Sequence, residues 1–122
     1  MAFIKSTSVI TSTSITVPNL SGGTNGKVVR MTSSNIVADA SNTDSVAQLS
    51  SILIKQNDTY YAAGVIDGFV GLSAGSAYFL AADGTLTPTA PTPSSTVRSL
   101  MLGFAINSTT LLFRPGLVIS GQ

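Results

Sequence analysis

Few side chains in this 122-residue sequence could carry out chemistry. The chain contains no histidine, cysteine or tryptophan, and its five acidic residues are all aspartates. Nucleophilic catalysis needs a base close to the nucleophile, most often a histidine. A serine–lysine or serine–aspartate pair stays open, but serine is so common here that no spacing singles one out. We therefore expect a protein that is not an enzyme and that holds no cofactor or metal.

The aspartates are better explained as turn and loop residues than as reactive groups. Asp67 and Asp83 each precede a glycine, which is typical of turns. Asp39 and Asp44 lie in one polar loop and could share a cation with Asn42. A calcium site needs about six to eight oxygen ligands, and no EF-hand spacing organises these residues. A surface loop is therefore the favoured prediction for residues 39–44.

Three tyrosines are the remaining candidates for ligand binding. Tyr60, Tyr61 and Tyr78 could stack on a sugar or a base, because an aromatic ring offers a flat apolar face. Packing within the core or between strands is the favoured interpretation, and recognition of a glycan is the alternative.

The composition predicts an all-β protein that works through its surface. Hydrophobic residues make up 43% of the chain and charged residues only 9%, against about 25% charged in a typical domain. Serine and threonine take the place of charged residues, and both disfavour helix interiors while threonine suits strands. Low charge gives little repulsion between exposed strand edges. We infer that much of the surface is buried against copies of the chain or a larger assembly, with a Ser/Thr-rich monomer as the alternative.

Charge and hydropathy argue against two classes of partner. The net charge is +1 and the six basic residues are scattered, whereas nucleic-acid binding needs clustered lysine and arginine. No apolar run approaches the roughly 18 residues of a membrane span, and the first residues lack the pattern of a signal peptide. We expect neither nucleic acid nor a membrane as partner.

The chain divides into an N-terminal stretch and one β domain. Residues 1–20 carry Val9, Ile15 and Val17 at odd-numbered positions and end near Pro18. This stretch predicts an edge strand or an extended arm that orders against a partner, with a frayed terminus as the alternative. Residues 21–122 have the length of a single domain.

Apolar and β-branched runs predict most of the strands. Asp67-Gly68 and Asp83-Gly84 predict the tight turns of hairpins. Residues 45–55 are ambiguous, because they fit a helical face capped by Thr43 or Asp44 and also contain a strand-like Ile-Leu-Ile run. The expected strands are 27–32, 36–38, 60–66, 77–81, 85–87, 97–106 and 111–114, with a possible last strand at 117–119.

An internal repeat relates the two halves of the chain. Gly26 and the strand after it match Gly75 and its strand, 49 positions later. In each half a turn, a short apolar segment and a polar or proline-rich loop follow in the same order. The repeat favours a strand over a helix at 45–55. It predicts two similar β units packed as a small antiparallel barrel or sandwich, which would protect strand edges.

Short motifs run through the second half of the chain, and the pattern that they belong to extends upstream to near Gly26. They are GLSAGSAYFL at 71–80, GTLT at 84–87, APT at 90–92, Val97, GFA at 103–105 and STTLL at 108–112. This pattern resembles a module of tailed-bacteriophage virion proteins. The resemblance implies an all-β structural module of the kind found in capsid decoration (cement) proteins and in tail fibres.

The resemblance also implies partners and a location. A stand-alone chain favours a decoration protein on the capsid surface of the virion, bound to the major capsid protein as a homo-oligomer, with a trimer favoured. The alternative is a tail-fibre or receptor-binding module among tail proteins, recognising glycans of the host surface. The expected contact regions are the N-terminal arm and the loops at 39–44 and 88–95. The residues expected there are Val9, Ile15, Val17, Asp39, Asp44, Pro88, Pro91 and Pro93.

Overall fold

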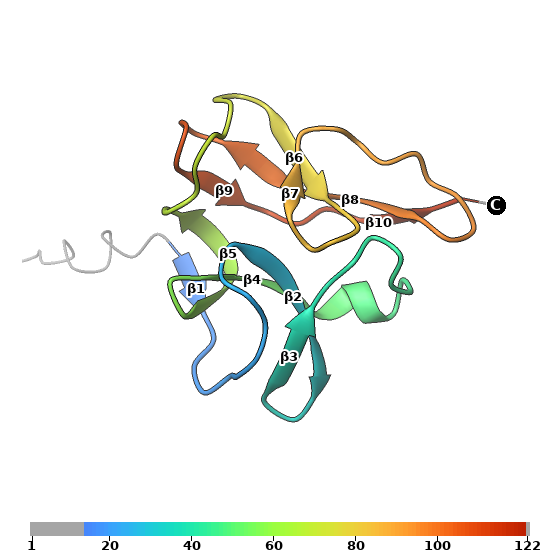
Figure 1. Cartoon of the computed structure of the whole chain (residues 1–122), viewed down its shortest axis with the longest axis horizontal. Coiled ribbons are helices and arrows are strands. Elements are labelled where there is room, and N and C mark those ends of the chain that lie inside the picture. The colour runs from blue at the N-terminus through green and yellow to red at the C-terminus, as the bar shows by residue number, and fades with distance from the viewer. Residues whose placement is uncertain (1–13, 122) are drawn as a thin grey trace, which may run out of the picture.

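The protein is built almost entirely from antiparallel β-strands, which confirms the all-β prediction (Figure 1). The structure is a computed structural model that describes residues 14–121. Among these residues, no helix is long and apolar enough to span a membrane. The strands are β1 (Ser14–Thr16), β2 (Lys27–Ser33), β3 (Ile36–Asp39), β4 (Ile52–Gln56), β5 (Thr59–Ile66), β6 (Ala77–Leu80), β7 (Leu86–Thr87), β8 (Arg98–Ala105), β9 (Leu111–Phe113) and β10 (Val118–Ser120), with a 3₁₀-helix η2 at Gln48–Ser51.

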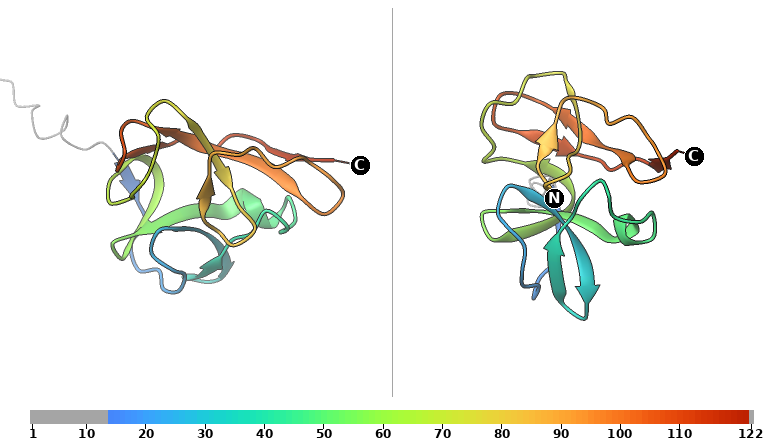
Figure 2. Two further views of the ribbon diagram at one scale, coloured as in Figure 1. Left: turned by 45° about the horizontal axis from the view of Figure 1, so that its top comes forward. Right: turned by 45° about the vertical axis from the view of Figure 1, so that its right-hand side comes forward.

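The two halves of the chain have the same strand connections. The strands are hydrogen-bonded in the order β3-β2-β4-β5-β9-β8-β6-β7, with β1 added to β5 and β10 added to β8. In each half a hairpin (β2–β3 or β6–β7) is followed by a strand that returns beside the first hairpin strand (β4 or β8). We call residues 14–58 unit 1 and residues 59–121 unit 2. Their sheets form two halves of one curled sheet, seen from three directions in Figures 1 and 2.

Backbone conformation repeats at the spacing that the sequence suggests. Positive φ angles, which are uncommon outside glycine, asparagine and aspartate, fall at matching places in both units. Four such coincidences at one spacing support the internal repeat. The pairs are Asn19 (66°) and Gly68 (99°), Gly22 (103°) and Gly71 (75°), Gly26 (84°) and Gly75 (83°), and Asn35 (63°) and Gly84 (89°).

Matching hydrogen bonds open the first strand of each hairpin. The N–H of Gly26 donates to the carbonyl of Lys55 at 2.7 Å, and the N–H of Gly75 donates to the carbonyl of Ala105 at 2.8 Å. Each bond joins the start of a hairpin to the far end of the returning strand. The two units therefore share local geometry as well as strand order.

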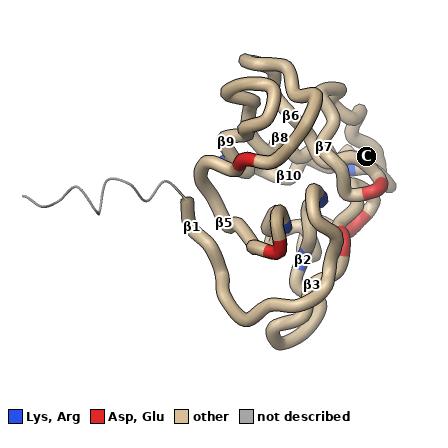
Figure 3. Tube along the Cα trace, turned by 60° about the vertical axis from the view of Figure 1, so that its left-hand side comes forward, with Lys and Arg blue, Asp and Glu red and all other residues tan. Residues whose placement is uncertain are grey.

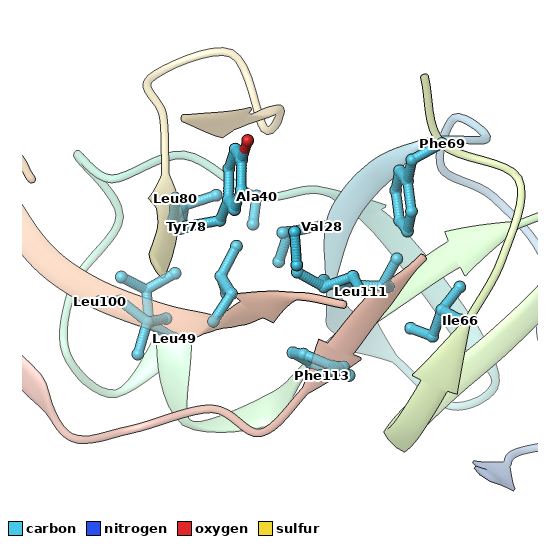
Figure 4. Packing of buried hydrophobic residues seen from close by; sticks show 13 residues of the cluster. Val28, Ala40, Leu49, Ile66, Phe69, Tyr78, Leu80, Leu100, Leu111 and Phe113 are labelled. Atoms are coloured by element: carbon cyan, nitrogen blue, oxygen red, sulfur yellow. The ribbon is translucent and has the colours of Figure 1, made fainter. Parts of the chain in front are cut away.

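The main core lies between the two halves of the sheet (Figure 4). Val28 and Ile54 of unit 1 are fully buried there against residues of β6, β8 and β9. Burial of this apolar area is the main favourable contribution to folding. The buried members of the main core are Val28, Ala40, Leu49, Ile54, Ile66, Phe69, Tyr78, Leu80, Leu100, Leu102, Ala105, Leu111 and Phe113.

A second, smaller core lies on the other side of the unit 1 sheet. It contains Val29, Val37, Leu53 and Tyr60. Successive side chains of a strand point to opposite faces, so Val29 faces this cluster while its neighbour in β2 faces the main core. The segment after β1 packs over the second core through Val17 and Leu20. Unit 1 is thus covered on both faces of its sheet.

Residues 45–55 contain both a short helix and a strand. Gln48–Ser51 form η2 and Ile52–Gln56 form β4. The proposed cap at Thr43 or Asp44 is wrong, because Ser45 instead exchanges hydrogen bonds with Gln48. Its N–H donates to the Gln48 side chain at 2.9 Å, and its hydroxyl accepts from the Gln48 N–H at 3.1 Å.

Of the two predicted hairpin turns, one is confirmed and one is wrong. Asp83-Gly84 joins the paired strands β6 and β7. Asp67-Gly68 joins no hairpin, because β5 pairs with β1, β4 and β9 rather than with β6. The carboxylate of Asp67 instead accepts a hydrogen bond from the Thr110 hydroxyl at 2.5 Å, which fixes the strand end beside the β8–β9 connection.

Candidate partner-binding surface

The two aspartates of the 39–44 loop are both engaged within the chain. The carboxylate of Asp39 accepts from the N–H and the hydroxyl of Thr24, each at 2.8 Å, and lies 3.9 Å from the Lys27 ammonium. Asp44 accepts from Arg30 Nε at 3.1 Å and from the Ser41 N–H at 2.8 Å. The carboxylates thus hold different neighbours. No cluster of three or more metal-ligating residues occurs within residues 14–121.

Asn42 connects this loop to unit 2, a role that no pattern in the sequence indicates. Its side chain is 8% exposed and donates to the Leu80 carbonyl at 3.3 Å. Its backbone N–H donates to Ala81, and its carbonyl accepts from the Arg98 N–H at 2.7 Å. Part of the loop that we expected to contact a partner therefore joins the two units of the chain itself.

The other expected contact residues lie in different settings. Ile15 on β1 is 63% exposed, whereas Val17 is half-buried against the second core. In the loop after β7, Pro88 and Pro93 are exposed and Pro91 is half-buried. Val9 lies outside the described residues. The exposed residues among them therefore come from two different elements, Ile15 from β1 and the two prolines from the loop after β7.

The tyrosines lie mainly in the interior. Tyr60 is 7% exposed and donates its hydroxyl to the Gly22 carbonyl at 2.7 Å. Tyr78 is 4% exposed, and its hydroxyl accepts from the Ser73 N–H at 2.8 Å. Tyr61 packs against the main core and is half-buried. The rings of Tyr60 and Tyr78 thus serve packing, and their polar ends brace loops.

Two shallow hollows open on the surface. One of about 220 Å³ lies beside the segment after β1, between Pro18, Asn19 and Thr59. The other, of about 360 Å³, lies where the units meet, and Gln56 and Phe69 are among its lining residues. Asp58 lines the first hollow, and the other lining residues of both hollows offer apolar groups, amides and hydroxyls, so neither lining pairs an acid with a base.

An exposed apolar surface lies on the outward side of the unit 2 sheet. Tyr78, Leu111 and Phe113 point into the main core, so the side chains between and beside them point away from it. This side carries apolar residues from four strands and the β9–β10 link. We call it the outer face, and its residues are Phe79, Met101, Phe104, Leu112, Leu117 and Ile119.

Strand pairing makes these residues neighbours. Phe79 is paired with Met101, and Phe104 is paired with Leu112. Between these pairs the register shifts at a β-bulge, which leaves one residue of β8 unpaired. The extra residue keeps Met101 and Phe104 on the same side of the sheet. Ile119 continues the face along β10, beside β8.

The outer face combines exposure with low charge. Leu117 is 87% exposed, Ile119 is 55% exposed and Met101 is 37% exposed. Arg114, whose guanidinium lies 5.7 Å from the centre of the Phe104 ring, borders the face. Figure 3 marks the charged residues along the chain, and none of the six outer-face residues is charged. A contiguous exposed apolar surface of this kind is typical of an interaction site.

One pattern in the sequence indicates this face. Leu100–Ile106 is apolar at both odd and even positions and is interrupted only by Gly103. A strand that is apolar on both sides is covered on both sides, either within its own chain or by a partner.

No protein-family model matches the chain, and no curated protein or solved structure matches it either.

Proposed function

We propose that this protein is a non-enzymatic structural component of a bacteriophage particle that binds the outside of the head and stabilises it. The observation that supports the proposal is the exposed, apolar outer face on a small duplicated β scaffold, which suits a protein that works as a homo-oligomer. Such a scaffold offers contact area rather than reactive groups. The phage assignment itself rests on the motif resemblance in the second half of the chain.

The stabilising mechanism is added contact area across the boundaries between capsid subunits. A standard interface buries about 1,600 Å² in total, and many copies on one head act together. Only 9% of the residues are charged, so few ions need to lose water when the surface is covered. The arm before Pro18, the exposed part of the 39–44 loop and the prolines at 88 and 93 are proposed to meet the head, with the protein acting as a homo-oligomer.

The glycan-binding alternative finds less support. It depended on exposed aromatic rings, and Tyr60 and Tyr78 are buried with bonded hydroxyls. Only Tyr61 retains partial exposure.

The decisive experiment adds the purified protein to heads of the encoding phage assembled without it. We expect binding that saturates at a fixed number of copies per head, together with greater resistance of the heads to heat. A chain with Pro88 and Pro93 replaced by serine tests the loop contact, since both positions are exposed. Absence of binding by the unchanged protein would reject head decoration.

A further inference from the structure

The internal repeat makes the outer face comparable with a surface inside the molecule. Moving back 49 positions from Ala77 and Met101 in unit 2 leads to Val28 and Ile52 in unit 1. Past the bulge, Phe104 corresponds to Ile54, because Phe104 pairs with Ala77 as Ile54 pairs with Val28. The unit 1 residues are all apolar. Val28 and Ile54 are fully buried in the main core, and Ile52 packs against it. The same side of the repeated sheet is therefore covered in unit 1.

In unit 1 this side of the sheet is covered by unit 2 of the same chain. The main core joins Val28 and Ile54 to residues of β6, β8 and β9. In unit 2 the corresponding side carries the outer face, and nothing within residues 14–121 covers Leu117 or Ile119. Within residues 14–121, the two copies of the sheet thus have a single internal partner for that side between them.

We propose that the outer face is the contact between copies of this chain. The first argument is the repeat, because a surface of this same protein already packs on the equivalent side of unit 1. The second is chemistry, because Phe79, Met101, Phe104, Leu112, Leu117 and Ile119 offer no charge that a strongly acidic or basic partner would recognise. Apolar residues at the centre and an arginine at the rim are the usual composition of a self-associating interface.

The proposal concerns self-association, which the proposed function also assumes, and it can hold whether or not the protein binds a head. A second copy on the outer face leaves the β1 side of the molecule and the 39–44 loop available for another surface. A failure of self-association would leave the head-binding experiment unaffected, and the reverse also holds.

The test measures the mass of the protein by sedimentation over a range of concentrations. The unchanged chain is expected to exceed its 12.4 kDa monomer mass. Leu117→Asp places a charge on the outer face and is expected to weaken association at least about tenfold. Because Leu117 is 87% exposed, the variant should keep its fold, which circular dichroism checks.

The matched control is Val70→Asp. Val70 is also 87% exposed, but it lies beside the hollow between the units. It is expected to associate like the unchanged chain. A monomeric unchanged chain at every concentration would overturn the proposal, as would assemblies that Leu117→Asp leaves intact or that both variants disrupt equally. A monomer would also indicate that the face serves a different protein or the chain's own residues 1–13.

Discussion

The two units have the same strand order but different surroundings. In unit 1 both sides of the sheet are covered, by the main core on one side and by Val17 and Leu20 over the second core on the other. In unit 2 one side faces the main core, and on the other side Met101, Leu117 and Ile119 are exposed within the described residues. The difference shows that duplication of a sheet repeats its backbone, whereas the burial of each copy depends on what lies next to it.

The largest effect is expected at a glycine that has no counterpart in unit 1. A Cβ on Gly103 would lie 1.9 Å from the Leu112 carbonyl oxygen, and its φ of +144° is rare for other residues. The matching residue of β4 is Leu53, which pairs with Val29 as Gly103 pairs with Tyr78. Gly103→Ala should separate β8 from β9 and reduce the free energy of unfolding by about 4 kcal/mol or more. Chemical denaturation followed by circular dichroism measures this.

Gly116→Ala is the control for that variant. Gly116 follows β9, has no positive φ, and its Cβ would meet only an ordinary contact at 3.7 Å. Its expected effect is within about 0.5 kcal/mol. Equal stability of the two variants would contradict the interpretation of the β8–β9 contact.

The second prediction compares equivalent glycines directly. A Cβ on Gly22 would lie 2.2 Å from the Val37 carbonyl oxygen, whereas a Cβ on Gly71 would have no neighbour within 4 Å. Both have positive φ, so each substitution should cost about 1–2 kcal/mol from conformation alone. We expect a total of about 3 kcal/mol or more for Gly22→Ala and about 1 kcal/mol for Gly71→Ala. Similar thermal midpoints for the two would contradict the tighter packing around unit 1.

The third prediction tests the joint between the units. Asn42→Ala removes the side-chain donor to the Leu80 carbonyl and leaves that buried oxygen with one bond fewer. The expected loss of stability is about 1–2 kcal/mol. The neighbouring exposed variant, Thr43→Ala, should change stability by no more than about 0.5 kcal/mol. Urea denaturation of both variants distinguishes a joint from an ordinary loop.

The smallest effect concerns the β6–β7 turn. The hydroxyl and N–H of Thr85 donate to the carboxylate and hold the pKa of Asp83 below its ordinary value. A lowered folded pKa stabilises the protein above the unfolded pKa of about 3.9 and loses that contribution as the pH falls through the folded value. Asp83→Asn should therefore be slightly less stable than the unchanged chain at neutral pH and equal to it in acid.

The matching turn of unit 1 provides the control. Its residue at the corresponding position is Ser34, which has no carboxylate. Ser34→Ala should differ from the unchanged chain by the same amount at every pH. A pH-dependent difference for Ser34→Ala, or none for Asp83→Asn, would contradict the assignment of this acid sensitivity to unit 2.

Local patterns in the sequence were sufficient for most of the strands and for the repeat. Gly26, Gly75 and the Asp83-Gly84 turn carry conformational preferences that act over a few residues, and all lie where the structure needs them. Asp67-Gly68 was wrongly predicted to join two hairpin strands. The backbone bends there, but β5 pairs with β9, which lies far along the chain.

The candidate surface depended on contacts that no short pattern encodes. Whether Met101 is buried or exposed depends on the bulge in β8 and on which unit covers that side of the sheet. Asn42 is an unremarkable loop asparagine in the sequence, and only the packing of unit 1 on unit 2 gives it buried partners. The apolar residues at both odd and even positions of β8 indicate a strand that is apolar on both sides, but they do not indicate what covers it.

The pairing of β5 has a consequence for how the protein unfolds. β5 is bonded to β1 and β4 of unit 1 and also to β9 of unit 2. Neither unit can therefore lose its structure while the other keeps all of its strand pairs. Despite its duplicated architecture, the chain should melt in a single cooperative transition, so that damage in one half is felt throughout the molecule.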